Sequence, residues 1–265
     1  MDDYNVSTES GRDGKRVELF ETNKTGKAIN FVFACLLFVA TILILLFANE
    51  EPYVVKFIVI VILLACVIFN VLYASIVFKP RGKGVAYIAI VASGLLFACC
   101  GDMLYLSHVF LSLSLFGVAH LIFLSSLIVI SGVKVRDAVI SLIVFGCGFL
   151  IINLNPAFQL GYHRTFVIVY TLIMSLLLGK SISMLFEINN KWIYALIMVG
   201  IALLFIANLM KLFYEFAGNV KIFNVIAVST YYPAVMVLAF SLFIVGGNYI
   251  AYHSNNKSVK HDNAG

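Results

Sequence analysis

Residues 109–131 read VFLSLSLFGVAHLIFLSSLIVIS, and none of them is Asp, Glu, Lys or Arg. A membrane-spanning helix needs roughly 20 consecutive apolar residues, so this run is long enough to cross a bilayer. The rest of the chain has the same character, because 62% of its 265 residues are hydrophobic and only 12% are charged. Soluble domains carry about 25% charged residues. The composition therefore excludes a water-soluble enzyme and a disordered chain.

Apolar runs of this kind occur eight times along the chain. They lie at about 28–48, 53–78, 84–106, 109–131, 136–153, 163–185, 192–214 and 222–251. Long unbroken runs are typical of transmembrane helices, whereas a transmembrane barrel has alternating strands of about ten residues. The sequence therefore predicts an all-α fold, a polytopic membrane helical bundle of eight transmembrane helices over residues 28–251. Polar tails at 1–27 and 252–265 flank this membrane domain.

The distribution of basic residues predicts the orientation of the bundle. If the eight spans alternate in direction, fourteen of the 18 Lys and Arg residues fall on the side of the two tails. The other side has only Lys56, Arg164, Lys211 and Lys221. Because Lys and Arg are enriched in cytoplasmic loops, both termini are predicted to be cytoplasmic. We expect a multi-pass integral protein of the cytoplasmic membrane, the endoplasmic reticulum or the plasma membrane, with no nucleic-acid partner.

Polar side chains inside the spans are the first candidates for function. A charge at the centre of a bilayer costs about 2.5–3.5 kcal/mol on insertion scales, so such residues need a reason to be there. Asp102 is the one acid well inside a span, about four residues before the outer end of the third run. His120 lies near the middle of the fourth run and Asn208 in the seventh. A hydrogen bond between helices is the structural alternative for His120, and snorkelling to the interface is the alternative for Lys211.

Two further polar groups lie in later spans. Tyr170 is in the sixth run, and Thr230-Tyr231-Tyr232-Pro233 places two phenols beside a proline in the eighth. Tyrosine pairs of this kind are commonly interfacial anchors, which is the alternative to a binding role. The five cysteines all lie in apolar runs, and no spacing of Cys and His typical of a metal site is present. We predict no metal and no other cofactor.

The order of these motifs resembles a known family. Gly94-Leu95-Leu96-Phe97 through Gly101-Asp102, followed by Phe116-Gly117-Val118-Ala119-His120, resembles the YhhN family of lysoplasmalogenases. Further elements that resemble the family are Lys56, Val169-Tyr170, the segment from Gly200 to Asn208, and Thr230-Tyr231-Tyr232. The resemblance covers about residues 30–250. Leu95-Leu96-Phe97 before Asp102 and Leu203-Leu204-Phe205 before Asn208 also allow a four-plus-four internal repeat, with both polar residues at the same depth.

The resemblance implies an enzyme that hydrolyses the vinyl ether bond of lysoplasmalogens to a fatty aldehyde and a glycerophospho head group. The implied partners are water and a lysophospholipid that reaches the site from the bilayer. Choline and ethanolamine head groups both remain open, as do a monomer and a homodimer. The implied catalytic residues are Asp102, Asn208 and His120, and the implied substrate-binding residues are Lys56, Tyr170, Tyr231 and Tyr232.

The chemistry of a vinyl ether indicates what each group would do. Protonation of the outer alkene carbon of the vinyl ether gives an oxocarbenium ion, and water then adds to this ion. The reaction therefore needs a carboxylic acid and a positioned water. Burial of Asp102 favours the neutral acid. The chain departs from the family pattern at Asn208, where many members have Asp, and at Val235, where members have Gln or His. These departures leave two alternatives: a catalytically impaired, lipid-binding member of the family, and a small-solute transporter.

Overall fold

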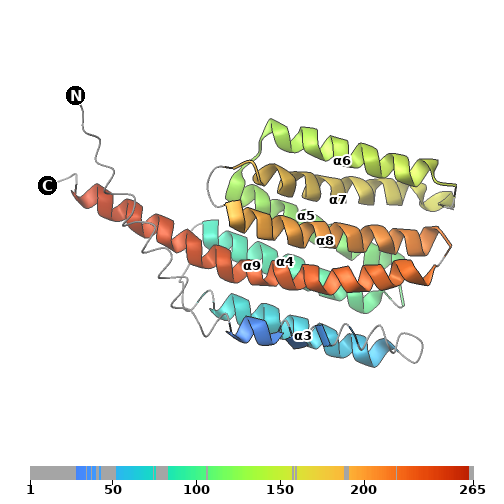
Figure 1. Cartoon of the computed structure of the whole chain (residues 1–265), viewed down its shortest axis with the longest axis horizontal. Coiled ribbons are helices and arrows are strands. Elements are labelled where there is room, and N and C mark those ends of the chain that lie inside the picture. Colours follow the sequence, from blue (N-terminus) through green and yellow to red (C-terminus); the bar gives the residue numbers. More distant parts are fainter. Residues whose placement is uncertain are drawn as a thin grey trace.

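Long helices make up nearly all of the part of the chain that the computed structural model describes (Figure 1). The described residues are 28–33, 35–36, 38–39, 42, 52–73, 75, 83–105, 107–156, 158, 160–187, 191–218 and 220–262. For residues 52–56, 83, 243 and 246–262 the description is limited to the backbone. The elements are α3 (Pro52–Tyr73), α4 (Lys83–Leu104), α5 (Val109–Ser131), α6 (Val135–Leu154), the short 3-10 helix η3 (Gly161–His163), α7 (Arg164–Met184), α8 (Lys191–Phe216) and α9 (Lys221–Asp262).

Six of these helices are long and apolar enough to cross a membrane. They are α4, α5, α6, α7 together with η3, α8, and the Lys221–Leu242 part of α9. The predicted all-α membrane fold is confirmed for the described residues, and the predicted run 109–131 coincides with α5. Each run could be predicted as a helix from its own residues, because an apolar segment in a bilayer satisfies its backbone hydrogen bonds by forming a helix.

The first two predicted spans have a different outcome. Residues in 28–42 that the structure describes are helical, and the rest of the run 28–48 lies outside the described residues. The second run was predicted to reach residue 78; α3 covers it to Tyr73, and residues 74 and 76–78 lie outside the described part of the chain. Its described apolar part, Phe57–Tyr73, is shorter than the six spans above. The count of eight and the cytoplasmic position of both termini therefore stay predictions.

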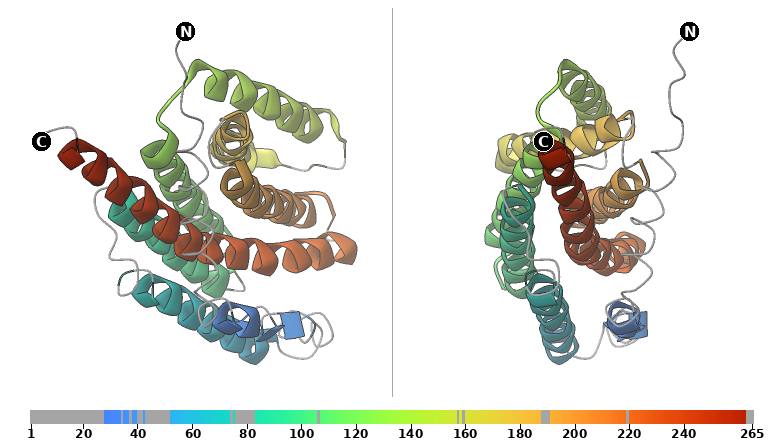
Figure 2. Two further views of the ribbon diagram at one scale, coloured as in Figure 1. Left: turned by 60° about the vertical axis from the view of Figure 1, so that its left-hand side comes forward. Right: turned by 90° about the vertical axis from the view of Figure 1, so that its left-hand side faces the viewer.

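The helices alternate in direction and pack as consecutive hairpins. The most extensive contacts join α4 to α5, α6 to α7, and α8 to α9. The helix α3 packs on α4 and α9, while α6 packs mainly on α7, so these two helices form opposite edges of the bundle (Figures 1 and 2). The α4–α5, α6–α7 and α8–α9 connections lie at one end of the bundle, which we call the hairpin end. At the other end, α9 extends beyond the bundle and includes most of the predicted tail 252–265.

A charged cluster joins α6 and α7 at the end opposite the hairpin end. The ammonium of Lys180 donates to Asp137 Oδ2 at 2.6 Å and to the carbonyl of Gly132 at 2.5 Å. The hydroxyl of Ser183 donates to the other carboxylate oxygen of Asp137 at 2.5 Å. Lys180 is 3% exposed and Asp137 is 8% exposed, so this is a buried ion pair.

Close contact between α6 and α7 depends on a small residue at position 179. A Cβ added to Gly179 would lie 2.5 Å from Ser141 Cα and 2.6 Å from Ser141 N, which are backbone atoms of α6. Small residues allow membrane helices to approach this closely, and the contact brings Asp137 and Lys180 within reach of each other.

We expect Gly179→Ala to lower the free energy of unfolding by about 1–3 kcal/mol, because the added methyl group forces the two backbones apart. Gly146→Ala on α6 is the matched control, since no described atom lies within 4 Å of a Cβ at that position. Alanine is also the better helix former there, by about 1 kcal/mol in a helix interior. Denaturant titration in detergent micelles measures both variants. Equal destabilisation by the two changes would contradict the prediction.

Candidate functional site

Asp102 is held at the hairpin end by the close packing of α4 on α5. A Cβ at Gly101 would lie 3.2 Å from the carbonyl oxygen of Ser112, so the glycine lets the two backbones approach. The hydroxyl of Ser112 donates to the carbonyl of Gly101 at 2.6 Å, which ties the last turn of α4 to α5. The Gly101-Asp102 pair therefore has a structural explanation, in which the glycine allows the close contact that orients the carboxyl group.

The depth of Asp102 differs from the prediction. It was expected about four residues inside the end of its span, but α4 ends at Leu104, only two residues later. Asn208, expected at the same depth, lies eight residues before the end of α8 at Phe216. The two residues therefore lie at different distances from the ends of their helices, and the four-plus-four repeat, which was based on the two Leu-Leu-Phe segments, stays a prediction. Asp102 is nevertheless 3% exposed, because side chains from α8 and α9 cover it.

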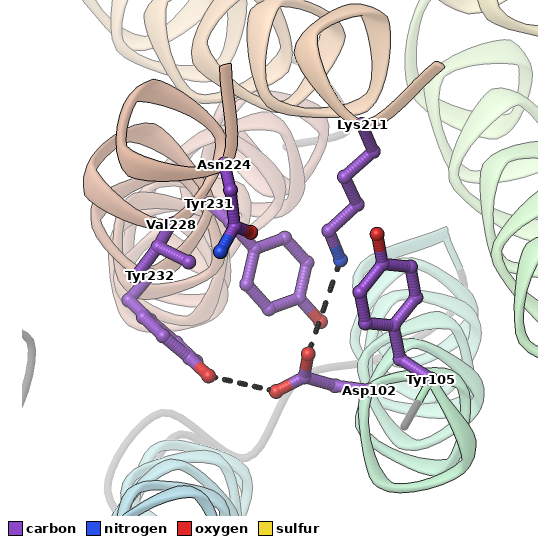
Figure 3. Close-up of a pocket in the computed structure, with 7 residues that line it drawn as sticks. All are labelled: Asp102, Tyr105, Lys211, Asn224, Val228, Tyr231 and Tyr232. Carbon is purple, nitrogen blue, oxygen red and sulfur yellow. Dashed lines mark hydrogen bonds and ion pairs between the residues drawn. The ribbon is translucent and has the colours of Figure 1, made fainter. Parts of the chain in front are cut away.

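Two side chains from other helices reach the carboxyl group of Asp102. The hydroxyl of Tyr232 on α9 donates to Oδ2 at 2.8 Å, and the ammonium of Lys211 on α8 lies 3.9 Å from Oδ1 (Figure 3). Residues from the three helices α4, α8 and α9 therefore meet at one carboxyl group.

Lys211 is buried within this site. Its side chain is 4% exposed, and its ammonium lies 4.7, 4.3 and 4.6 Å from the ring centroids of Tyr105, Phe116 and Tyr231. A desolvated cation over an aromatic ring gains about 2 kcal/mol or more, so three rings compensate part of the cost of burial. The snorkelling alternative for Lys211 is wrong, because the side chain points to Asp102 and the aromatic rings.

Tyr105 extends the site toward the outside of the bundle. Its hydroxyl donates to Glu215 Oε1 at 2.6 Å. Burial raises the pKa of the Tyr105 phenol well above its usual value, and the hydrogen bond to Glu215 raises the pKa further. Tyr105 is thus a neutral hydrogen-bond donor at any ordinary pH.

These residues line a pocket at the hairpin end. Its empty volume is about 250 Å³, a figure that includes space open to the outside. Typical ligand pockets have about 300–1,000 Å³, so this one suits a small polar group or the reacting end of a longer molecule. The lining residues are Asp102, Tyr105, Lys211, Asn224, Val228, Tyr231 and Tyr232. Among these described residues, only Asp102 is acidic and only Lys211 is basic.

The other predicted catalytic residues form a separate buried cluster. The hydroxyl of Tyr170 donates to Asn208 Oδ1 at 2.7 Å. The amide nitrogen of Asn208 lies 3.3 Å from His120 Nε2 and donates to the carbonyl of Leu204 at 2.7 Å. The other ring nitrogen of His120, Nδ1, contacts the carbonyl of Phe116. We call Tyr170, Asn208 and His120 the amide cluster.

The hydrogen bonds of the amide cluster require one tautomer of His120. The carbonyl of Phe116 can only accept, so Nδ1 carries the ring proton and Nε2 accepts from the amide of Asn208. The oxygen of Asn208 is then left for the hydroxyl of Tyr170. An amide satisfies both neighbours because it is a donor and an acceptor at once.

We expect Asn208→Leu to lower the free energy of unfolding by about 2–4 kcal/mol, because two buried polar groups, Tyr170 Oη and His120 Nε2, lose their partner. Asn153→Leu is the matched control, since Asn153 binds Arg164 at an exposed position. A change within about 0.5 kcal/mol is expected there. Unfolding of both variants in detergent is compared with that of the wild type. A fully stable Asn208→Leu protein would contradict the account of the amide cluster.

The remaining predicted site residues lie at different places. Tyr231 and Tyr232 line the pocket, and the hydroxyl of Tyr231 donates to the carbonyl of Ala98 at 3.2 Å. Lys56 belongs to α3, but its side chain lies outside the described part of the chain. Val235 is 1% exposed within the core of the bundle. The structure thus brings Asp102 together with the two tyrosines, and gathers Asn208, His120 and Tyr170 in the amide cluster.

Three residues that line the pocket, Tyr105, Asn224 and Val228, were not predicted from the sequence, although their spacing from Asp102 and from the two tyrosines indicates a shared helix face. Asn224 and Val228 precede Tyr231 and Tyr232 by seven and four residues, so the four lie on one face of α9. Tyr105 follows Asp102 by three residues and lies over the same side of the α4 end. A search for polar residues on the helix faces that carry Asp102 and Tyr232 would have found Tyr105 and Asn224.

The fold and the site define a polytopic helical membrane protein with a polar, charged pocket at one end of its bundle. The sequence model of the YhhN family matches residues 52–242, which include α3 to α8, the apolar part of α9 and every residue of the pocket. The chain therefore belongs to the YhhN family. The comparison with curated proteins and the comparison with solved structures each gave no significant match.

Proposed function

We propose that the chain is a membrane-embedded hydrolase that cleaves the vinyl ether bond of lysoplasmalogens, releasing a fatty aldehyde and a glycerophospho head group. The observation that carries the proposal is the buried carboxyl group of Asp102, which faces a pocket and has a tyrosine hydroxyl and an ammonium beside it. Membership of the YhhN family is consistent with a hydrolase.

The reaction needs a proton at the outer alkene carbon and negative charge beside the oxocarbenium ion that forms. A single carboxyl group supplies both in turn, since it becomes an anion when it gives up its proton. In the proposal Asp102 has this role. The hydroxyl of Tyr232 donates to Oδ2 of Asp102, which leaves Oδ1 as the oxygen that faces the substrate.

The place of the pocket in the bundle suits a lysophospholipid. In the proposal the pocket lies near the level at which lipid head groups meet water, because Asp102 is two residues from the end of α4. A vinyl ether at the glycerol end of a lysophospholipid is at the same level, while its chain extends among apolar side chains. In this arrangement Tyr231, Tyr105 and Asn224 are the groups available to contact the glycerophospho part.

The amide cluster is proposed to support the site from inside the bundle. The carbonyl of Phe116 binds His120, and the ring of Phe116 lies under the ammonium of Lys211. The residues Asn208, His120 and Tyr170 therefore act on the pocket through Phe116 in this proposal, and not by direct contact with the substrate.

Release of aldehyde by the purified protein tests the proposed function. The protein in detergent is incubated with 1-alkenyl lysophospholipids with choline and with ethanolamine head groups, without added metal or cofactor. Free aldehyde is measured by mass spectrometry, and the 1-alkyl lysophospholipid is the control because it lacks the double bond. Aldehyde from the alkenyl lipid alone is the expected result. A folded protein that releases no aldehyde would contradict the proposal and favour a lipid-binding member without catalysis.

A further inference from the structure

We infer that Lys211 is the second acid–base group of the site, and that its amine removes the proton of the water that attacks the oxocarbenium ion. This inference rests on the proposed vinyl ether hydrolysis. Lys211 and Asp102 are the two charged residues that line the described pocket, and they come from helices α8 and α4.

The two groups are close together but do not form a direct hydrogen bond. The ammonium of Lys211 is 3.9 Å from Oδ1 of Asp102, which is longer than a direct hydrogen bond. Each group can therefore contact a third group in the pocket while the pair stays together. Figure 3 shows the two side chains meeting from opposite walls, with the rings of Tyr105 and Tyr231 alongside.

The exchange of one proton within the pair supplies both forms that the reaction needs. Aromatic faces stabilise the ammonium of Lys211 but offer no lone pair that would accept its proton. Transfer of one proton from the ammonium of Lys211 to the carboxylate of Asp102 turns this buried ion pair into two neutral groups. The pair then holds a carboxylic acid and an amine, the two forms that the reaction needs.

Other titratable groups near the pair are less suited to activate water. The three that also line the pocket, Tyr105, Tyr231 and Tyr232, use their hydroxyl protons in hydrogen bonds to Glu215, Ala98 and Asp102. His120 uses Nε2 to accept from Asn208 and is not a lining residue. The titratable groups close enough to interact electrostatically with Asp102 are Cys99 from α4, Tyr105 from the α4–α5 turn, and Tyr231 and Tyr232 from α9. His120 from α5 is close enough to interact in this way with Lys211.

The proposed steps balance in atoms and charge. Lys211 first gives a proton to Asp102, leaving an amine and a carboxylic acid. Asp102 then protonates the outer alkene carbon, where the π electrons form the new C–H bond, and an oxocarbenium ion remains beside the carboxylate. The oxygen of a water molecule adds to the oxocarbenium carbon, and its proton passes to the amine of Lys211, which restores the ammonium. The neutral hemiacetal releases aldehyde and glycerol hydroxyl by moving its own O–H proton to the leaving oxygen.

Substitutions at Lys211 separate the role of its charge from the role of its proton. Arginine keeps the positive charge but does not give up a proton in proteins, whereas alanine removes both. We expect Lys211→Arg and Lys211→Ala each to lower aldehyde release by about 10²–10⁴-fold. Methylamine and ethylamine should partly restore Lys211→Ala and should not restore Asp102→Asn.

Each outcome of this experiment decides the inference. Restoration of Lys211→Ala by amines, together with an inactive but folded Lys211→Arg protein, would support it. Near wild-type activity of Lys211→Arg would overturn it, as would a folded Lys211→Ala protein that amines do not restore. If Lys211→Ala does not fold, the Lys211→Arg comparison decides. A wild-type protein that releases no aldehyde would remove the proposed function and this inference together, whereas an active wild type with an active Lys211→Arg would remove the inference alone.

Discussion

Asp102→Asn is expected to lower aldehyde release from 1-alkenyl lysophospholipids by about 10²–10⁴-fold, the range typical of a lost general acid. An amide has nearly the size of the carboxyl group and can still accept the hydrogen bond from Tyr232, so the local structure is kept. It cannot protonate an alkene carbon or carry the negative charge that stabilises the oxocarbenium ion. The measurement is the initial rate of aldehyde formation with saturating lipid.

Loss of the acid must be separated from loss of the fold in this variant. Lys211 loses its counter-charge in Asp102→Asn, so rates are taken well below the unfolding midpoint of each protein. Glu187→Gln is the matched control, because it is also an acid-to-amide change, and Glu187 pairs with Lys134 and Arg136 away from the pocket. Glu187→Gln should keep nearly the wild-type rate. An Asp102→Asn protein as active as that control would remove Asp102 from the mechanism.

Lys180→Met is expected to lower the free energy of unfolding by about 3–5 kcal/mol, the largest stability effect that we predict. The substitution leaves the carboxylate of Asp137 in a buried position, with Ser183 and the backbone of Lys134 as its remaining donors. It also leaves the carbonyl of Gly132, at the end of α5, without the ammonium that now binds it. Denaturant titration in detergent measures the change.

The control for this prediction is a second ion pair at the same end of the bundle, which is more exposed than the Asp137–Lys180 pair. Lys134 pairs with Glu187 at a site where the lysine side chain is 44% exposed. An exposed ion pair contributes about 0–1 kcal/mol, so Lys134→Met should have little effect. Similar losses in Lys180→Met and Lys134→Met would show that burial of the Asp137–Lys180 pair does not matter for stability.

Much of the fold was predictable because it depends on properties of single segments. The run 109–131 matches α5, and the predicted run 136–153 differs from α6 by one residue at each end. Hydrophobic length decides whether a segment can span a bilayer, and this length is read directly from the sequence. Asp102, Tyr231 and Tyr232 were also found in this way, as polar groups in apolar surroundings, and the structure gathers them at one pocket.

The axial position of these residues was less predictable. The run around Asp102 was extended to residue 106, because Tyr105 and Leu106 are apolar enough to continue a span. The helix α4 ends two residues after Asp102, at Leu104, so the acid lies nearer to the end of its helix than its place in the apolar run indicated. Apolar side chains continue past the end of a helix when they pack in the turn that follows, and Tyr105 is 8% exposed there.

The sequence alone determined that the chain is helical, membrane-spanning and a member of the YhhN family, because apolar length and motif order are properties along the chain. The tertiary structure alone decided that Lys211 faces Asp102, and that Asn208 binds His120 and Tyr170 away from the pocket. Asn208 and Lys211 are three residues apart on α8, yet they belong to different clusters. The rotation and axial offset of neighbouring helices decide which partner each side chain meets, and both depend on how α4, α5, α7, α8 and α9 pack together.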